Sequence, residues 1–203
     1  MKHHRGHLFQ QIFQRRLVFT LSNGLSFARL LSGIYIYYLI QTHRVFEALI
    51  FIALAIASDF LDGYFARKQH QISELGKILD PLADKFLLVS CYLSLAWMGA
   101  LPGWLVLVVV GRDLVILFGA VAYHYRVEPL SAAPTAISKL NTLAQLLLVL
   151  AVLFERGVMA LPPGWLETLI YVVLATTLLS GFDYVWTWGW RAWNKRHGTG
   201  RFP

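Results

Sequence analysis

The stretch SDFLDGYFARKQHQISELGKILDPLADKF, residues 58–86, holds four aspartates between two long apolar runs. They are Asp59, Asp62, Asp80 and Asp84. An ionised carboxylate in apolar surroundings is costly unless a proton, a basic partner or a metal ion compensates its charge. What surrounds these aspartates therefore bears on both the fold and the chemistry of the chain.

The composition identifies those surroundings. Of 203 residues, 57% are hydrophobic and only 14% are charged. A soluble domain of this length needs more polar surface, so we predict an integral membrane protein. The formal net charge of +7 fits cytoplasmic loops that face anionic lipid headgroups, and we expect no nucleic-acid partner. The single cysteine, Cys91, excludes an internal disulfide.

Six apolar segments approach the roughly 20 residues that cross a bilayer as a helix. They cover residues 26–40, 46–65, 79–98, 104–123, 136–154 and 166–186. Lipid admits only helices or closed barrels, and these runs are too long for barrel strands. The predicted fold is therefore an all-α membrane protein, with one domain of six transmembrane helices over residues 21–190.

Residues 1–20 are predicted to be an amphipathic segment that lies in the membrane interface before the first span. Within it, HLFQQIFQRRLVF (residues 7–19) interleaves apolar residues with Gln and Arg. Residues 191–203 are predicted to be a basic cytoplasmic tail. Most of the 18 Lys and Arg residues lie in these two segments and in the connections near residues 67–77 and 126–139. The positive-inside rule therefore places both termini in the cytoplasm.

This topology brings the four aspartates to one side of the membrane. Two of them close the second predicted span and two open the third, at similar shallow depth. At 100° per residue, the small residues Gly63 and Ala66 share a helix face with the first pair, and Gly76 with the second. Faces lined by small residues leave room for a ligand or a second helix to approach closely.

Carboxylates without His or Cys are typical ligands of hard divalent cations, above all Mg²⁺. Two such ions would neutralise the aspartates and leave positions open for phosphate oxygens, while Arg67, Lys77 and Lys85 offer some basic compensation. The same acids could instead form the ion pathway of a small cation transporter. The carboxylates alone leave both interpretations open.

The spacing favours the first interpretation. Written out, it is Asp59-x₂-Asp62-Gly63-x₂-Ala66-Arg67-x₈-Gly76-x₃-Asp80-x₃-Asp84. This pattern resembles, position for position, the signature of the CDP-alcohol phosphatidyltransferase family. The stretch SNGLSFARLLSG (residues 22–33) is similar to the Asn-x-x-Thr/Ser-x-x-Arg pattern that opens the family's first span. An intramembrane prenyltransferase is the nearest enzyme alternative, although its aspartate groups lie far apart on a longer chain.

The resemblance implies transfer of a phosphatidyl group from CDP-diacylglycerol to an alcohol, with release of CMP. It implies that Asp59, Asp62 and Asp80 hold two divalent ions, Mg²⁺ or alternatively Mn²⁺, and that Asp84 completes the metal site and acts as the general base. It also implies a homodimer, and we expect the protein in the inner membrane of a bacterium.

The resemblance further implies a donor site at the same helices. Asp62, Gly63 and Ala66 would line it on the second span, and Gly76 would leave space for cytidine. Arg67 would pair with the phosphates of the donor.

The acceptor is less well determined by the sequence. Arg112, Lys139 and Arg29 are the predicted acceptor-binding residues, since intramembrane cations are candidates for function. Phosphatidylglycerophosphate synthases resemble Gly-Lys-x-Lys-Thr where this chain has Ser-Lys-Leu-Asn-Thr (residues 138–142), so a neutral amide replaces one lysine. That difference favours phosphatidylglycerol as acceptor, as in the cardiolipin synthases of the family, with glycerol 3-phosphate as the close alternative.

Overall fold

The protein is all-helical over the residues that the structure describes. A computed structural model describes residues 21–69, 76–126 and 135–197. Within these ranges the helices are α2 (Leu21–Gln41), α3 (Val45–Gln69), α4 (Gly76–Trp97), α5 (Gly103–Arg126), α6 (Ala136–Gly157) and α7 (Trp165–His197). Each predicted span lies within one of these helices, apart from Met98, which follows the last residue of α4. The all-α prediction is confirmed.

The structure describes part of the predicted C-terminal tail but none of the predicted N-terminal segment. The predicted interfacial segment, residues 1–20, lies outside the described residues, as do residues 198–203. Helix α7 continues to His197, so the predicted boundary between bundle and tail at residue 190 falls inside this helix.

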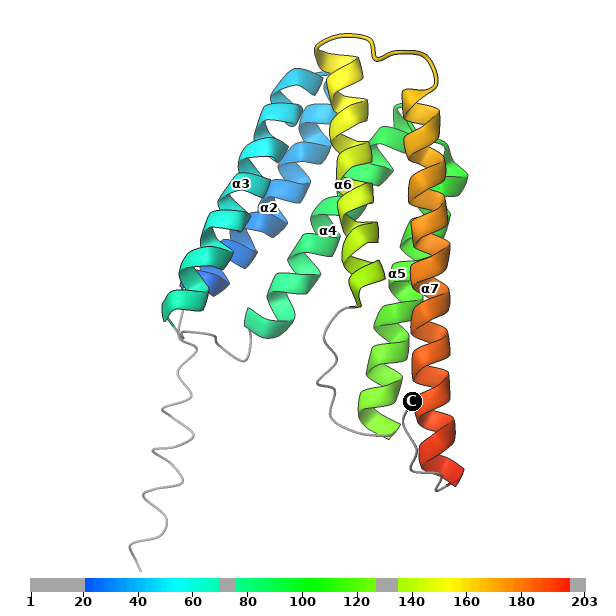
Figure 1. Cartoon of the computed structure of the whole chain (residues 1–203). Helices are drawn as coiled ribbons and strands as arrows, with labels where there is room; N and C mark the ends of the chain where they lie inside the picture. The colour runs from blue at the N-terminus through cyan, green and yellow to red at the C-terminus, as the bar shows by residue number, and fades with distance from the viewer. Residues whose placement is uncertain (1–20, 70–75, 127–134, 198–203) are drawn as a thin grey trace, which may run out of the picture.

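The helices run alternately up and down (Figure 1). The connections α2–α3, α4–α5 and α6–α7 lie at one end of the bundle, drawn uppermost. The start of α2, the end of α3, the start of α4 and the end of α7 all lie at the opposite end. Helix α2 packs most extensively against α4 and also contacts α3, while α6 contacts α3, α4 and α7. The end of α3 and the start of α4, which carry the aspartate stretch, therefore lie at the same end of the bundle as the start of α2 and the end of α7.

Each of the three upper connections contains a residue in the left-handed conformation. Gly99 and Gly164 have φ of 70° and 85°, which glycine adopts without steric cost. His43 adopts φ of 60° in the shortest connection, between α2 and α3. These tight turns keep consecutive helices antiparallel and adjacent.

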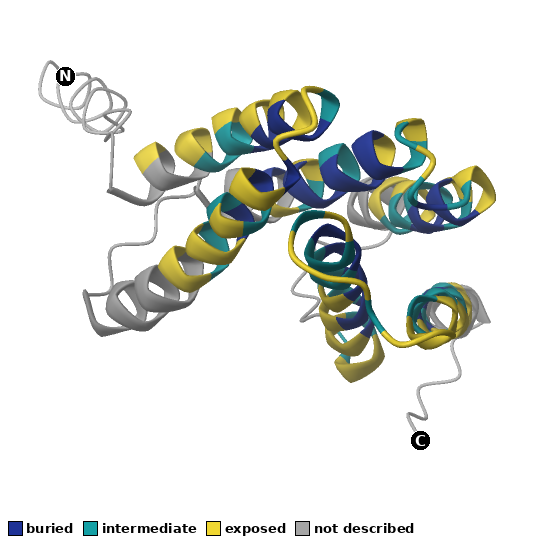
Figure 2. Cartoon of the chain, turned by 90° about the horizontal axis from the view of Figure 1, so that it is seen from above, coloured by how far each residue is buried: buried dark blue, intermediate teal, exposed yellow. Residues whose placement is uncertain are grey.

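The buried core follows the helical period of the sequence. On α6 the buried residues recur at three- and four-residue intervals, as Asn141, Ala144, Gln145, Leu148, Val149 and Val152 do. Figure 2 shows the buried positions on the faces that helices turn towards one another, with exposed positions outside. Tyr92 and Leu95 of α4 are fully buried, as is Leu105 of α5.

The outward faces are apolar as well. Large hydrophobic side chains such as Leu107, Phe118, Leu179 and Phe182 are well over a third exposed. An apolar surface of this extent fits contact with lipid. Among the described side chains, two helical segments, Ala136–Gly157 and Trp165–Thr187, are long and apolar enough to cross a membrane. These features indicate a membrane protein.

Two glycines allow close helix contacts. A Cβ on Gly157 would lie 3.0 Å from the backbone nitrogen and 3.1 Å from the Cα of Phe46, so α6 meets the start of α3 at backbone distance. A Cβ on Gly33 of α2 would lie 3.0 Å from the ring of Phe86 on α4. Gly111 of α5, in contrast, has no atom within 4 Å of such a Cβ.

We therefore expect Gly157→Ala to destabilise the protein by about 1–3 kcal/mol, the typical cost of overpacking, because the opposing backbone cannot move aside cheaply. Gly111→Ala is the control: it adds the same methyl group in open space and should leave stability unchanged or raise it by up to about 1 kcal/mol. Thermal unfolding of both variants in detergent measures the difference. Equal midpoints would contradict the close contact.

Candidate active site

The aspartates lie on two helix ends at the same end of the bundle (Figure 1). Asp59 and Asp62 belong to the last turns of α3, and Asp80 and Asp84 to the first turns of α4. Gly76 is the first residue of α4. Helix α2 contacts both α3 and α4. The helical part of the pattern thus has the predicted antiparallel arrangement.

Most side chains of the pattern are not among those that the structure describes. Those outside are Asp59, Asp62, Gly63, Ala66, Arg67, Gly76 and Asp80. Among the described side chains, no group of three or more His, Cys, Asp or Glu gathers as a metal site would require. The predicted metal and donor sites therefore remain predictions, except for the surroundings of Asp84.

Asp84 forms an ion pair with Arg29 of α2. The guanidinium Nη1 of Arg29 donates to Oδ1 of Asp84 at 2.5 Å. The side chain of Arg29 is 15% exposed and that of Asp84 is 48% exposed. Two residues that the sequence assigned to separate roles, acceptor binding and base catalysis, thus contact each other across the α2–α4 interface.

The next residue of α4, Lys85, faces the other side of the bundle. Its Nζ donates to Oδ1 of Asp113 on α5 at 2.9 Å. The same oxygen accepts from Nη1 of Arg112 at 2.7 Å. The carboxylate of Asp113 therefore compensates two cations. Through Lys85, the residue after the candidate base, it also joins α5 to α4.

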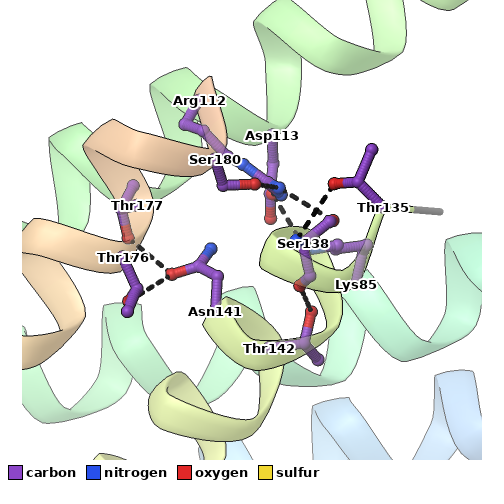
Figure 3. Close-up of polar contacts among 10 residues, drawn as sticks. All are labelled: Lys85, Arg112, Asp113, Thr135, Ser138, Asn141, Thr142, Thr176, Thr177 and Ser180. Atoms are coloured by element: carbon purple, nitrogen blue, oxygen red, sulfur yellow. Dashed lines mark hydrogen bonds and ion pairs between the residues drawn. The ribbon is translucent and has the colours of Figure 1, made fainter. Parts of the chain in front are cut away.

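Arg112 extends this network to α6 and α7 (Figure 3). Its Nη2 donates to the hydroxyl of Ser138 at 2.9 Å and also to the hydroxyl of Ser180. Its guanidinium carbon lies 5.8 Å from the ring centre of Tyr184. Of the side chains that the structure describes, Arg112 is the one charged side chain that is buried. Its Nε is buried and has no hydrogen-bond partner among the described residues.

A second group of polar bonds lies one turn further along α6 (Figure 3). The Oδ1 atom of Asn141 accepts from the hydroxyls of Thr176 at 3.0 Å and Thr177 at 2.9 Å. Its Nδ2 is buried and makes no hydrogen bond within the part of the chain that the structure describes. Asn141 is fully buried, as is Gln145 in the next turn. The two side-chain amide atoms of Gln145 likewise find no partner among the described side chains.

We call these residues the polar cluster: Lys85, Arg112, Asp113, Ser138, Asn141, Thr176, Thr177 and Ser180. The N-cap of α6 supports it, because the side chain of Thr135 accepts from the backbone nitrogen of Ser138 at 3.2 Å. Lys139, predicted as an acceptor ligand, is exposed and makes no bond to the cluster among the described contacts.

The sequence analysis did not predict that side chains of α7 belong to the polar cluster. Thr176, Thr177, Ser180 and Asp183 interrupt an otherwise apolar run at intervals of three and four residues. That spacing places them near one helix face, and this was the available signal. Single hydroxyls also satisfy their own helix backbone, as Thr176 does with the carbonyl of Val172, so the signal was weak.

Comparison with known proteins adds the family. The family model described as CDP-alcohol phosphatidyltransferase matches residues 19–180. A Schizosaccharomyces pombe protein named as a cardiolipin synthase (CMP-forming)/mitochondrial hydrolase fusion is 36% identical over 187 residues, 84% of this chain and 31% of its own length. A cardiolipin synthase (CMP-forming) of Streptomyces coelicolor is 38% identical over 53% of this chain and 54% of its own.

A CDP-diacylglycerol–glycerol-3-phosphate 3-phosphatidyltransferase of Bacillus subtilis is 30% identical over 68% of this chain and 70% of its own length. Relatives with two different named activities thus resemble this chain to a comparable degree. The chain spans less than two thirds of the length of the first relatives given above.

The two ion-pair systems should differ in their contribution to stability. Asp113→Ala leaves Lys85 and the buried Arg112 without their carboxylate, and we expect a loss of about 3–5 kcal/mol. Arg29→Gln removes a partner from the half-exposed Asp84 and should cost about 1 kcal/mol or less. Unfolding of both variants in detergent measures the two losses, and a larger loss for Arg29→Gln would contradict this ranking.

Proposed function

This chain belongs to the CDP-alcohol phosphatidyltransferase family, and we propose that it transfers a phosphatidyl group from CDP-diacylglycerol to an alcohol and releases CMP. The family match carries the proposal, together with the eight-position pattern on the ends of α3 and α4. It favours this activity over the prenyltransferase and the transporter.

Members of the family generally use divalent metal ions. The donor set fits such ions, since four carboxylates on two helix ends offer hard oxygen ligands. We propose that Asp59, Asp62 and Asp80 hold two Mg²⁺ ions, or alternatively Mn²⁺, with Asp84 completing the site. When bound, such ions polarise the pyrophosphate and stabilise the departing CMP.

Asp84 is the proposed general base. It takes the proton of the acceptor hydroxyl as that oxygen bonds to the phosphorus of the phosphatidyl group, and the bond from this phosphorus to the CMP oxygen breaks. The Arg29 contact at 2.5 Å engages Oδ1. This contact fixes the direction of the carboxylate, and the 48% exposure of Asp84 leaves it accessible to a substrate.

The donor would lie along the last turns of α3 and the first turn of α4. Apart from the carboxylate of Asp62, the proposed donor-binding residues are small, namely Gly63, Ala66 and Gly76. A nucleotide could therefore approach the helix backbone. Arg67 would pair with its phosphates through charge-assisted hydrogen bonds.

The acceptor would lie beside Asp84 and Arg112, with Lys139 at its exposed edge. We propose phosphatidylglycerol as the acceptor, which makes the product cardiolipin, with glycerol 3-phosphate as the alternative. Arg29 contributes here through Asp84, which it contacts.

The proposed setting is the cytoplasmic side of a bacterial inner membrane, crossed six times, with both termini in the cytoplasm and the protein acting as a homodimer. The basic connections and the up-and-down order of the helices support this orientation.

The activity is tested by CMP release from CDP-diacylglycerol by purified protein, with each acceptor supplied in turn and the lipid product identified. We expect release that depends on Mg²⁺ and yields cardiolipin from phosphatidylglycerol. Asp59→Asn should abolish release by loss of metal. Asp84→Asn should still bind CDP-diacylglycerol but should turn over at least about 100-fold more slowly, the usual contribution of a general base.

Full activity of Asp84→Asn would exclude this residue as the base. Glu47→Gln is the control, since this carboxylate pairs with Arg44 at the opposite end of the bundle and should leave CMP release unchanged.

The orientation has a separate test. A membrane-impermeant maleimide should label Thr42→Cys from outside intact cells and Asn194→Cys only after permeabilisation. The native Cys91 is fully buried and should remain unlabelled. Labelling of both positions from the same side would contradict the six-span topology.

A further inference from the structure

The connection between α6 and α7 exposes apolar side chains at the end of the bundle away from the aspartates, drawn uppermost in Figure 1. Residues 158–164 read VMALPPG and contain no charged, hydroxyl or amide side chain. Val158 and Met159 are 48% and 62% exposed, and Trp165, the first residue of α7, is 61% exposed. The α2–α3 connection at the same end reads THR (residues 42–44) and is polar. The exposed apolar surface of the α6–α7 connection indicates contact with something other than water.

The lengths of the flanking helices indicate where this connection lies in the bilayer. The segments Ala136–Gly157 and Trp165–Thr187 contain 22 and 23 residues and are apolar enough to cross a membrane. At about 1.5 Å per residue they are about 33 and 35 Å long, close to the roughly 30 Å of the hydrocarbon core. Both segments therefore reach the edge of the hydrocarbon core where the connection joins them.

Charged residues beside the connection support this depth. Arg156 lies in the last turn of α6 and Glu167 in the first turn of α7, and both are exposed. Long charged side chains near helix ends extend to the headgroups while their backbone stays at the level of the acyl chains. The connection thus has charges on either side and none within it, as suits the boundary between headgroups and acyl chains.

Aromatic residues on three other helices favour the same boundary. Trp97 ends α4, Trp104 is the second residue of α5, and Tyr38 lies in the last turn of α2. All three are exposed, and they lie at the end of the bundle that also carries Trp165. Tryptophan and tyrosine are enriched at membrane interfaces. This end of the bundle therefore has the composition of an interface, independently of the connection itself.

The backbone of the connection also suits this position. Pro162 and Pro163 have no N–H group. The N–H groups of Val158 and Met159 donate to the carbonyl of Phe154 at 2.8 and 3.2 Å. Four of the seven residues 158–164 therefore bring no unpaired backbone donor, which lowers the cost of leaving bulk water.

We propose that residues 158–165 form a lipid-binding loop in the leaflet opposite the aspartates. Its apolar side chains enter the boundary between headgroups and acyl chains and anchor the joined ends of α6 and α7 there. The partner is the phospholipid bilayer itself. Because the segment carries no charge, its contact with lipid is apolar and does not depend on the charge of the headgroup. The inference goes beyond the proposed function and does not depend on the reaction.

A polarity-sensitive fluorophore on single cysteines tests this position. Met159→Cys and Thr42→Cys are each labelled with a bimane maleimide in the purified protein and reconstituted into phosphatidylcholine nanodiscs. Cys91 is fully buried and should not react. Thr42 is the matched control, because it is exposed in a connection at the same end of the bundle but lies in a polar sequence.

At position 159 we expect blue-shifted emission and strong quenching by phospholipid that carries a spin label close to the headgroup. Its iodide quenching constant should be severalfold smaller than the constant at position 42, where iodide should quench strongly and the labelled lipid weakly. Lipid quenching at position 159 should not change when part of the phosphatidylcholine is replaced by phosphatidylglycerol. Val158→Cys supplies a second position in the loop if Met159→Cys fails to fold.

Three results would overturn the proposal. Equal iodide quenching at positions 159 and 42 would mean that the loop lies in water. Equal lipid quenching at both positions would make lipid contact a property of the whole end of the bundle and not of this loop. Lipid quenching at position 159 that requires phosphatidylglycerol would exclude an apolar contact. None of these measurements uses CMP release, so the outcome is separate from that of the proposed function.

Discussion

Compensation of charge inside an apolar bundle is the constraint on which the rest of this structure depends. The helices pack through hydrocarbon side chains, so every ionised group among them needs a partner. Asp113 meets this need for two cations at once and joins α4 to α5, while Arg112 reaches the hydroxyls of α6 and α7. One buried guanidinium thereby connects the three helices that follow the aspartate pattern.

The fold was largely predictable because the apolar segments are long and the turns short. Segment length sets the number of helices, and each predicted span became one helix. The end of α7 was not predictable from apolarity, because this helix continues past Trp186 into a basic sequence that keeps helical order to His197. Hydropathy marks where lipid contact ends, and a helix need not stop there.

The candidate site was predictable in its residue types but not in its pairings. The spacing of the aspartates indicated their chemistry, whereas the partner of Arg29 depends on how α2 is rotated against α4. Likewise Asn141 was recognised as a neutral residue in a basic position, but the two threonines that orient it lie 35 and 36 residues away on α7. Such contacts belong to tertiary packing and have no local signature.

The two neighbouring residues Asp84 and Lys85 tie α4 to α2 on one face and to α5 on another. Turning α4 about its axis would break both ties together. Substitutions at positions 29, 84, 85 and 113 should therefore be energetically coupled, because both ion pairs depend on the same rotation of α4. Grafting the aspartate pattern onto another helical bundle would accordingly need both flanking ion pairs, because the pattern alone does not set the direction in which its last carboxylate points.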